Sequence, residues 1–287
     1  MEQVESNKLR DSVSKEYEAK LRQQGGFCAH QFETEFGYGE EALQSLPADA
    51  VDNSFGCANP LAMGTLNPGD TVVDLGSGAG IDVILAARKV GMQGRVIGVD
   101  MTGAMIEKAR RNIAEAGVDP IAEIRKGVIE SLPVESSSVD WVISNCVVSL
   151  SPDKKQVFSE VFRVLKPGGK MLLSDLVVEP LPVWLRAVIA LKSPASAKAL
   201  DRERYLATVA ASGLANVTLR SELVYDETML HSLVMDELNI REGFWRAVLD
   251  LNGAQVLSHL LKPLVRPAVR YGANKISSIK VYAEKPL

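Results

Sequence analysis

The sequence predicts an α/β fold in which a mostly parallel, seven-stranded sheet is flanked by helices. From about Asp70 onward, short runs rich in β-branched residues alternate with longer stretches of helical spacing. This alternation is typical of a parallel sheet with covering helices. In addition, a glycine-rich segment directly follows the first run and precedes a helical stretch, as expected where an open α/β sheet forms a ligand site.

The individual elements follow from the residue pattern in order along the chain. Strands are predicted at residues 71–76, 95–100, 122–127, 139–150, 170–178, 217–225 and 277–286. Helices are predicted at 80–90, 103–117, 154–169 and 201–213, the second closed by glycine and the third by Pro-Gly-Gly. We divide the chain into an N-terminal extension that could cap a substrate (1–60), a ligand-binding domain (61–225) and a C-terminal helical insertion followed by the last strand (226–287).

Composition and charge exclude some classes of function. The net charge of -4 and the pI near 5.6 argue against nucleic-acid binding, because phosphate binding needs a concentrated basic face. The N-terminal twenty residues are polar, unlike a signal peptide, and the apolar stretch 181–191 is too short to span a bilayer and contains Arg186. We therefore expect a cytoplasmic protein with neither a membrane partner nor a nucleic-acid partner.

Cysteine and histidine residues are few and widely spaced: Cys28, Cys57, Cys146, His30, His231 and His259. In the cytosol we expect the three cysteines to be reduced, since an odd, scattered set is a poor disulfide framework. A structural zinc ion usually needs four close-paired ligands. We therefore predict no metal site.

The glycine-rich segment "VVDLGSGAG" (72–80) indicates a nucleoside site. Glycines allow the backbone to bend tightly and approach a ligand, and the amides that open the next helix can hold an anionic group. Ile81 stands where a dinucleotide fingerprint would require glycine, which disfavours NAD or FAD. Asp74 precedes the first glycine, and Asp100 ends the next strand, where its carboxylate can accept hydrogen bonds from both ribose hydroxyls.

Together these residues resemble class I S-adenosylmethionine-dependent methyltransferases, and the resemblance covers most of residues 60–225. It implies a Rossmann-like fold and S-adenosyl-L-methionine as cofactor. Motif positions that match the family imply cofactor-binding roles for Asp74, Gly76, Ser77, Gly78, Gly80, Asp100, Met101, Ile129, Glu130 and Asn145.

The cysteine motifs narrow the resemblance. Cys146 follows the fourth predicted strand, and ligands of open α/β sheets bind beyond the carboxyl ends of the strands, although a buried cysteine is usually a small, inert residue. The segments "GCANP", "DLGSGAGIDV", "GVDMT" and "SNCVVSLSPDK" occur in the order found in arsenite methyltransferases, and "VSKEYEAKL", with Tyr17, is loosely similar to the N-terminal tyrosine motif of that family. Carried over by position, Cys57 and Cys146 are the thiolate ligands of trivalent arsenic, and Cys28 is an auxiliary thiol. The family usually has a further cysteine in a segment that corresponds to 192–200, and this chain has none there.

The resemblance therefore implies an enzyme that methylates thiolate-bound trivalent arsenic, arsenite or methylarsenite, as arsenic detoxification requires. Thiolates are natural ligands of soft As(III). The implied partners are the arsenic substrate, alone or as a thiol conjugate, and a small thiol or a thioredoxin-type reductant. Two alternatives remain open: methylation of an organic small molecule or an organoarsenical, and a non-catalytic thiol protein that binds arsenite.

Overall fold

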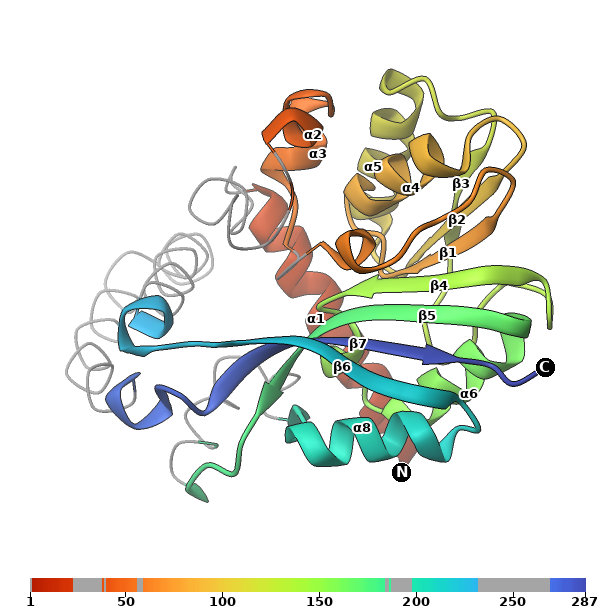
Figure 1. Ribbon diagram of the computed structural model, residues 1–287. Coiled ribbons are helices and arrows are strands. Elements are labelled where there is room, and N and C mark those ends of the chain that lie inside the picture. The colour runs from red at the N-terminus through yellow and green to blue at the C-terminus, as the bar shows by residue number, and fades with distance from the viewer. Residues whose placement is uncertain are drawn as a thin grey trace.

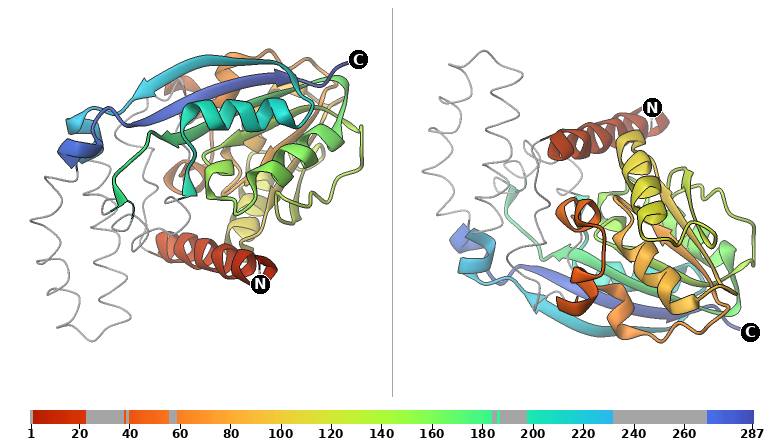
Figure 2. Two further views of the ribbon diagram at one scale, coloured as in Figure 1. Left: turned by 90° about the horizontal axis from the view of Figure 1, so that it is seen from below. Right: turned by 90° about the horizontal axis from the view of Figure 1, so that it is seen from above.

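The structure is a computed structural model of the chain, and it describes residues 2–22, 38, 40–55, 59–183, 186, 198–231 and 269–287. Its centre is a seven-stranded sheet with helices on both faces (Figures 1 and 2). None of the helices within these residues is long and apolar enough to cross a membrane.

The sheet has the strand order β3-β2-β1-β4-β5-β7-β6. Strands β1 to β5 pair in parallel, whereas β7 runs antiparallel to both β5 and β6. All seven predicted strands are present, so the predicted fold class is confirmed. The bounds are β1 Thr71–Leu75, β2 Arg95–Asp100, β3 Ala122–Lys126, β4 Val139–Asn145, β5 Leu165–Val178, β6 Ala215–Val224 and β7 Ile276–Glu284.

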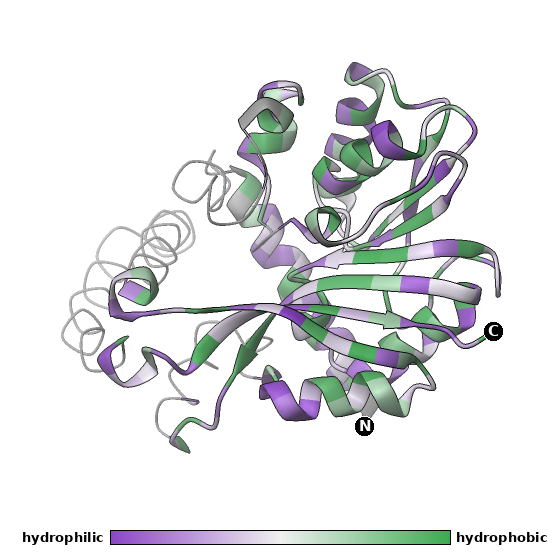
Figure 3. Cartoon of the chain, in the orientation of Figure 1, coloured by the Kyte–Doolittle hydropathy of each residue, from purple (hydrophilic) through white to green (hydrophobic). Residues whose placement is uncertain are grey.

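Alternate residues of the central strands bury their side chains on opposite faces, so the sheet separates two cores. Val72 belongs to the core beneath α4 (Ile81–Val90) and α5 (Gly103–Glu115), whereas Val73 belongs to the core beneath α6 (Lys154–Val164) and α8 (Arg202–Ala211). Because both faces are covered, the central strands are mostly hydrophobic along their length (Figure 3). The result is a three-layer α/β domain.

One long helix and three short elements precede the sheet. They are α1 Glu2–Arg22, α2 Glu40–Gln44, α3 Ala48–Asp52 and the 3-10 helix η1 Pro60–Met63. Residues of α2, α3 and η1 pack into the core beneath α4 and α5. Side chains of that layer hold them: Arg88 donates to the Ser45 hydroxyl and carbonyl oxygens at 2.6 and 2.7 Å, and Lys108 pairs with Asp49.

Two predicted elements end five residues earlier in the structure than the sequence indicates. The fourth strand ends at Asn145 instead of Leu150, because Cys146 has a φ of 58° and a 3-10 helix, η2 Val148–Leu150, follows it. The third predicted helix ends at Val164, before Pro167, and the chain continues directly into β5. Most of the predicted C-terminal helical insertion, residues 232–268, lies outside the described residues, and the proposed domain division stays a prediction.

Candidate active site

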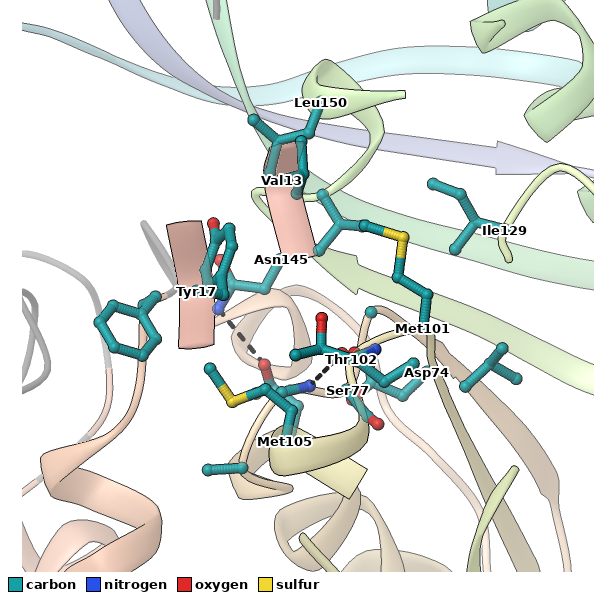
Figure 4. A pocket seen from close by; sticks show the side chains of 18 of the residues that line it. Val13, Tyr17, Asp74, Ser77, Met101, Thr102, Met105, Ile129, Asn145 and Leu150 are labelled. Atoms are coloured by element: carbon teal, nitrogen blue, oxygen red, sulfur yellow. Dashed lines mark hydrogen bonds between the residues drawn. The ribbon is translucent and has the colours of Figure 1, made fainter. Parts of the chain in front are cut away.

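A pocket opens at the carboxyl ends of β1, β2 and β4, where the sequence places the glycine turn and the strand tips. Its empty volume, open mouth included, is about 800 Å³. Ser77, Thr102 and Met105 form one wall, and Val13 and Leu150 lie opposite them (Figure 4).

The turn between β1 and α4 forms the floor of the pocket. Gly76 and Gly78 line it with φ of 68° and 51°, a left-handed conformation that glycine adopts without strain. A Cβ on Gly78 would meet nothing within 4 Å, so the open space begins directly at this backbone. Gly80 does not line the pocket. It caps α4 with a φ of 92°, and a Cβ there would lie 3.3 Å from the Cβ of Ala109 in α5.

Asp100 closes the turn from the end of β2. Its Oδ2 accepts from the Gly78 amide at 3.0 Å and its Oδ1 accepts from the Thr102 amide at 2.8 Å. Burial raises the pKa of Asp100, and the backbone amides of Thr102 and Gly78 partly offset this. Since each carboxylate oxygen has a second lone pair, Asp100 can still accept hydrogen bonds from a ligand diol.

Two further carboxylates lie on the pocket wall, one on each side of the turn between β1 and α4. Asp74 in β1 and Asp82 in α4 have 2% and 4% of their surface exposed. Burial raises the pKa of Asp74 well above its usual value, and the charges of Asp82 and Asp100 raise it further. Burial also raises the pKa of Asp82 to about 6, against hydrogen bonds from Tyr38 and Asn145 that lower it. Within the described part of the chain no lysine or arginine forms an ion pair with Asp74 or Asp82. A cationic ligand group would therefore be stabilised here.

Asp82 takes part in a buried hydrogen-bonded triad. The Tyr38 hydroxyl donates to Asp82 Oδ1 at 2.7 Å and accepts from Asn145 Nδ2 at 3.0 Å. Asn145 Nδ2 also lies 3.3 Å from Asp82 Oδ2. The triad joins the segment before α2, the start of α4 and the end of β4.

Helix α1 covers part of the pocket. Val13 and Tyr17 line the pocket (Figure 4). The Tyr17 ring meets Phe55 edge to face, with centroids 5.5 Å apart. Arg10 Nε lies 3.4 Å from Glu130 Oε2, close enough for an ion pair although it is not aligned as a hydrogen bond. Glu130 also accepts from the Ser151 hydroxyl at 2.6 Å and does not line the pocket.

Cys146 lies between two lining residues, Asn145 and Val147, but is itself 6% exposed and does not line the pocket. Its amide donates to the Ser174 carbonyl at 2.8 Å. Cys146 forms a disulfide whose other half lies outside the described residues. The expectation of three reduced cysteines is therefore wrong for Cys146, because the odd number and wide spacing of the cysteines do not prevent one pair from meeting in the fold.

The structure thus gathers eight of the predicted cofactor residues around one pocket: Asp74, Gly76, Ser77, Gly78, Asp100, Met101, Ile129 and Asn145. Gly80 and Glu130 lie behind its wall, and Cys28 and Cys57 lie outside the described residues. Sequence reasoning missed Asp82 and Tyr38. The sequence contained an indication for Asp82, because it is the one acidic residue in the apolar helix that directly follows the glycine turn. In the described segments, no group of three or more His, Cys, Asp or Glu side chains is placed to hold a metal ion.

Comparison with known proteins agrees with this geometry. Residues 66–223 match the family described as "Methyltransferase domain". A solved arsenic(III) S-adenosylmethionine methyltransferase from Chlamydomonas reinhardtii has 30% identity and a TM-score of 0.64, with 86% of this chain and 73% of that chain covered. The chain belongs to the arsenite S-adenosylmethionine methyltransferase family.

Curated relatives of this arsenite methyltransferase family support the assignment. The chain is 49% identical over 157 residues to the arsenite methyltransferase of Halobacterium salinarum and 38% identical over 147 residues to that of Mus musculus. These alignments cover 53% and 48% of this chain. They span only 40% and 39% of the two relatives, so the chain matches less than half of their length.

The family cofactor, S-adenosyl-L-methionine, fits the groups present in the pocket. The Gly78 backbone offers open space beside the Asp100 carboxylate, and the two carboxylates without a described cation can balance a ligand that carries an ammonium and a sulfonium. Met101 and Ile129 add apolar surface at the same pocket.

Proposed function

We propose that the protein transfers methyl groups from S-adenosyl-L-methionine to trivalent arsenic, either arsenite or methylarsenite, held by cysteine thiolates. The observation that carries this proposal is the position of Cys146. It directly follows Asn145, which lines the donor pocket, and its sulfur takes part in a disulfide. A cysteine sulfur that pairs with a second sulfur supports binding of a thiophilic As(III) substrate by two thiolates.

We assign Cys57 as the second arsenic ligand and Cys28 as an auxiliary thiol. Phe55, two residues before Cys57 in the sequence, lines the pocket. Asn59, two residues after Cys57, accepts from the Leu61 amide at 2.9 Å with its side chain and caps η1. Cys57 itself lies outside the described residues, and its role as a ligand stays a prediction.

The residues of the chain divide the work of the reaction. Asp74 and Asp82 would face the cationic end of the donor, and Asp100 would accept from its ribose hydroxyls. When bound, S-adenosyl-L-methionine supplies an electrophilic methyl group on a sulfonium. The cysteine thiolates would hold As(III) with its lone pair directed at that methyl carbon, and α1 with Val13 and Tyr17 would exclude water. No strong general base is required.

The electron balance of this reaction requires a reductant. The arsenic lone pair forms the As–C bond, the S–C bond breaks with its electron pair on sulfur, and arsenic is oxidised from As(III) to As(V). Two thiols, which become a disulfide, or one dithiol must return two electrons before another cycle. The Cys146 disulfide must likewise take two electrons and two protons from two thiols or one dithiol before Cys146 can bind arsenic, because only the thiolate is a ligand. We propose a small thiol or a thioredoxin-type protein as this partner.

The test is product analysis of the purified chain incubated with S-adenosyl-L-methionine and dithiothreitol plus either arsenite or methylarsenite. Mass spectrometry should detect methylated arsenic, and Cys57→Ser and Cys146→Ser should each lose most of it. A yield no higher than in a reaction without enzyme contradicts the proposal. Tight arsenite binding without product would favour the non-catalytic alternative, and methylation of an organic acceptor that survives both substitutions would favour the other.

A further inference from the structure

The hydroxyl of Tyr38 has no explanation in packing alone. The Tyr38 side chain is 8% exposed and its ring belongs to the core beneath α4 and α5, where a phenylalanine ring would fill the same space. Its hydroxyl, however, is buried between Asp82 and Asn145 and hydrogen-bonds to both. Burying a hydroxyl is unfavourable unless it has partners, and these two partners both line the donor pocket.

The three residues of this triad come from distant parts of the sequence. Tyr38 lies 44 residues from Asp82 and 107 residues from Asn145. Asp82 is on the pocket wall that faces the cationic end of the proposed donor, and Asn145 immediately precedes Cys146. The hydroxyl therefore joins the donor side of the site to the turn that presents the cysteine.

We propose that Tyr38 is a positioning residue for methyl transfer: its hydroxyl ties the Asp82 carboxylate to the Asn145 amide and so fixes the donor pocket relative to the turn that contains Cys146. The inference rests on the proposed donor site but not on arsenic as the substrate. Tyr38 acts through Asp82 and Asn145, and it does not line the pocket itself.

The same hydrogen bonds hold Asp82 in its charged form. Each favours the carboxylate over the carboxylic acid. Two titratable groups interact with Asp82: Tyr38, from the segment before α2, and Asp74 of β1. Asp100 of β2 interacts in turn with Asp74. Asn145 of β4 is neutral. Among the described side chains, removal of the Tyr38 hydroxyl leaves only the Asn145 amide to donate a hydrogen bond to the Asp82 carboxylate. The fraction of charged Asp82 at a given pH then falls.

The experiment compares Tyr38→Phe with Tyr205→Phe. Tyr205 is a matched control: it is fully buried, its hydroxyl donates to Asp175 Oδ2 at 3.0 Å, and it lies on the α8 face outside the pocket. Calorimetry should measure the Kd of S-adenosylhomocysteine from pH 5 to 8, and thermal unfolding of the free proteins should measure stability.

Both substitutions should lower the unfolding temperature. Only Tyr38→Phe should weaken the binding of S-adenosylhomocysteine. Its Kd should rise by about tenfold or more at pH 7, as expected for loss of a hydrogen bond to a charged group. Only Tyr38→Phe should also move the acidic limb of the binding profile to higher pH, by about one unit. A purely structural role would not move that limb.

A Tyr38→Phe variant with the wild-type Kd and pH profile, or with the changes that Tyr205→Phe shows, overturns the inference. If Tyr38→Phe does not fold, Asn145→Ser tests the same triad. It removes the amide that donates to the Tyr38 hydroxyl and should shift the acidic limb in the same direction; an unshifted limb overturns the inference.

A wild-type chain that binds no S-adenosylhomocysteine at any pH overturns the donor site and this inference with it. A wild-type chain that binds it normally but makes no methylated arsenic overturns only the proposed substrate.

Discussion

Gly76 in the glycine turn lies against Val147, the residue that follows Cys146. A Cβ on Gly76 would lie 2.4 Å from Val147 Cγ2 and 2.6 Å from Val147 Cγ1. The glycine turn of the donor site therefore contacts the turn that contains Cys146, and this contact is close because Gly76 has no side chain. Such a contact couples the positions of two loops that come from different strands, β1 and β4.

We predict that Gly76→Ala and Gly78→Ala fail in different ways. Gly76→Ala combines a left-handed φ with the Val147 clash, so it should lower the free energy of unfolding by more than about 2 kcal/mol. Gly78→Ala meets no neighbouring atom, so the strained φ alone should cost about 1 kcal/mol, while the new methyl group enters the pocket. Urea unfolding and calorimetry with S-adenosylhomocysteine separate the two effects. Equal stabilities of the two variants would contradict the contact with Val147.

Asp82→Asn should stabilise the free protein and weaken cofactor binding. Because the folded-state pKa of Asp82 is raised from 3.8 to about 6, the wild type loses stability as the pH rises between these values, and the Asp82→Asn variant loses none. The gain should be absent near pH 4 and reach up to about 3 kcal/mol at pH 7.5. The Kd of S-adenosylhomocysteine should rise at pH 7.5, because one charge that faces the ligand ammonium is gone. Thermal unfolding at both pH values measures the gain.

Asp119→Asn is the control for this substitution, because Asp119 is an exposed acid on a turn outside the pocket. It should change neither stability nor binding. A stability gain of Asp82→Asn that is equal at pH 4 and pH 7.5 would show that ionisation of Asp82 is not its cause.

Asp100→Asn should weaken cofactor binding without unfolding the turn between β1 and α4. Each oxygen of Asp100 accepts from one backbone amide, of Gly78 or Thr102, and an asparagine amide can accept from only one of them. The free energy of unfolding should fall by about 1–2 kcal/mol. The Kd of S-adenosylhomocysteine should rise about 10- to 100-fold, since an acceptor for the ribose is lost as well. Ribose-free fragments such as methionine serve as the internal control, because their binding should not change.

The sequence was sufficient to predict the central strands β1, β2 and β4 because each is a short run rich in β-branched residues that is mostly buried. It misplaced the end of β4, since "VVSL" after Cys146 is as apolar as the strand itself. What ends the strand is the φ of 58° at Cys146, which lets η2 turn back over β5. A hydrophobic pattern does not encode that torsion.

The candidate site was predictable to the extent that its residues follow strands directly. Asp74 and Asp100 do so, and both line the pocket. Asp82 and Tyr38 owe their roles to a contact across 44 residues of sequence, and nothing in the local pattern around Tyr38 distinguishes it from a core tyrosine. Tertiary folding also brings α1 over the pocket. Val13 has no motif that links it to the glycine turn, and Tyr17 was indicated only by a loose similarity to the tyrosine motif of the family.

Arg10→Gln should loosen α1 from the pocket. The Arg10–Glu130 ion pair is mostly buried, with 19% and 7% of the two side chains exposed, and its loss leaves Glu130 with the Ser151 hydroxyl and a buried charge. Amide hydrogen exchange in residues 2–22 should become about tenfold faster, which corresponds to about 1.4 kcal/mol of local opening. Saturating S-adenosylhomocysteine should slow this exchange in both proteins, because Val13 and Tyr17 then contact a ligand. Lys15→Gln removes the same charge from an exposed position of α1 and should leave exchange at the wild-type rate. Equal acceleration in both variants would mean that helix charge, and not the contact with Glu130, holds α1 in place.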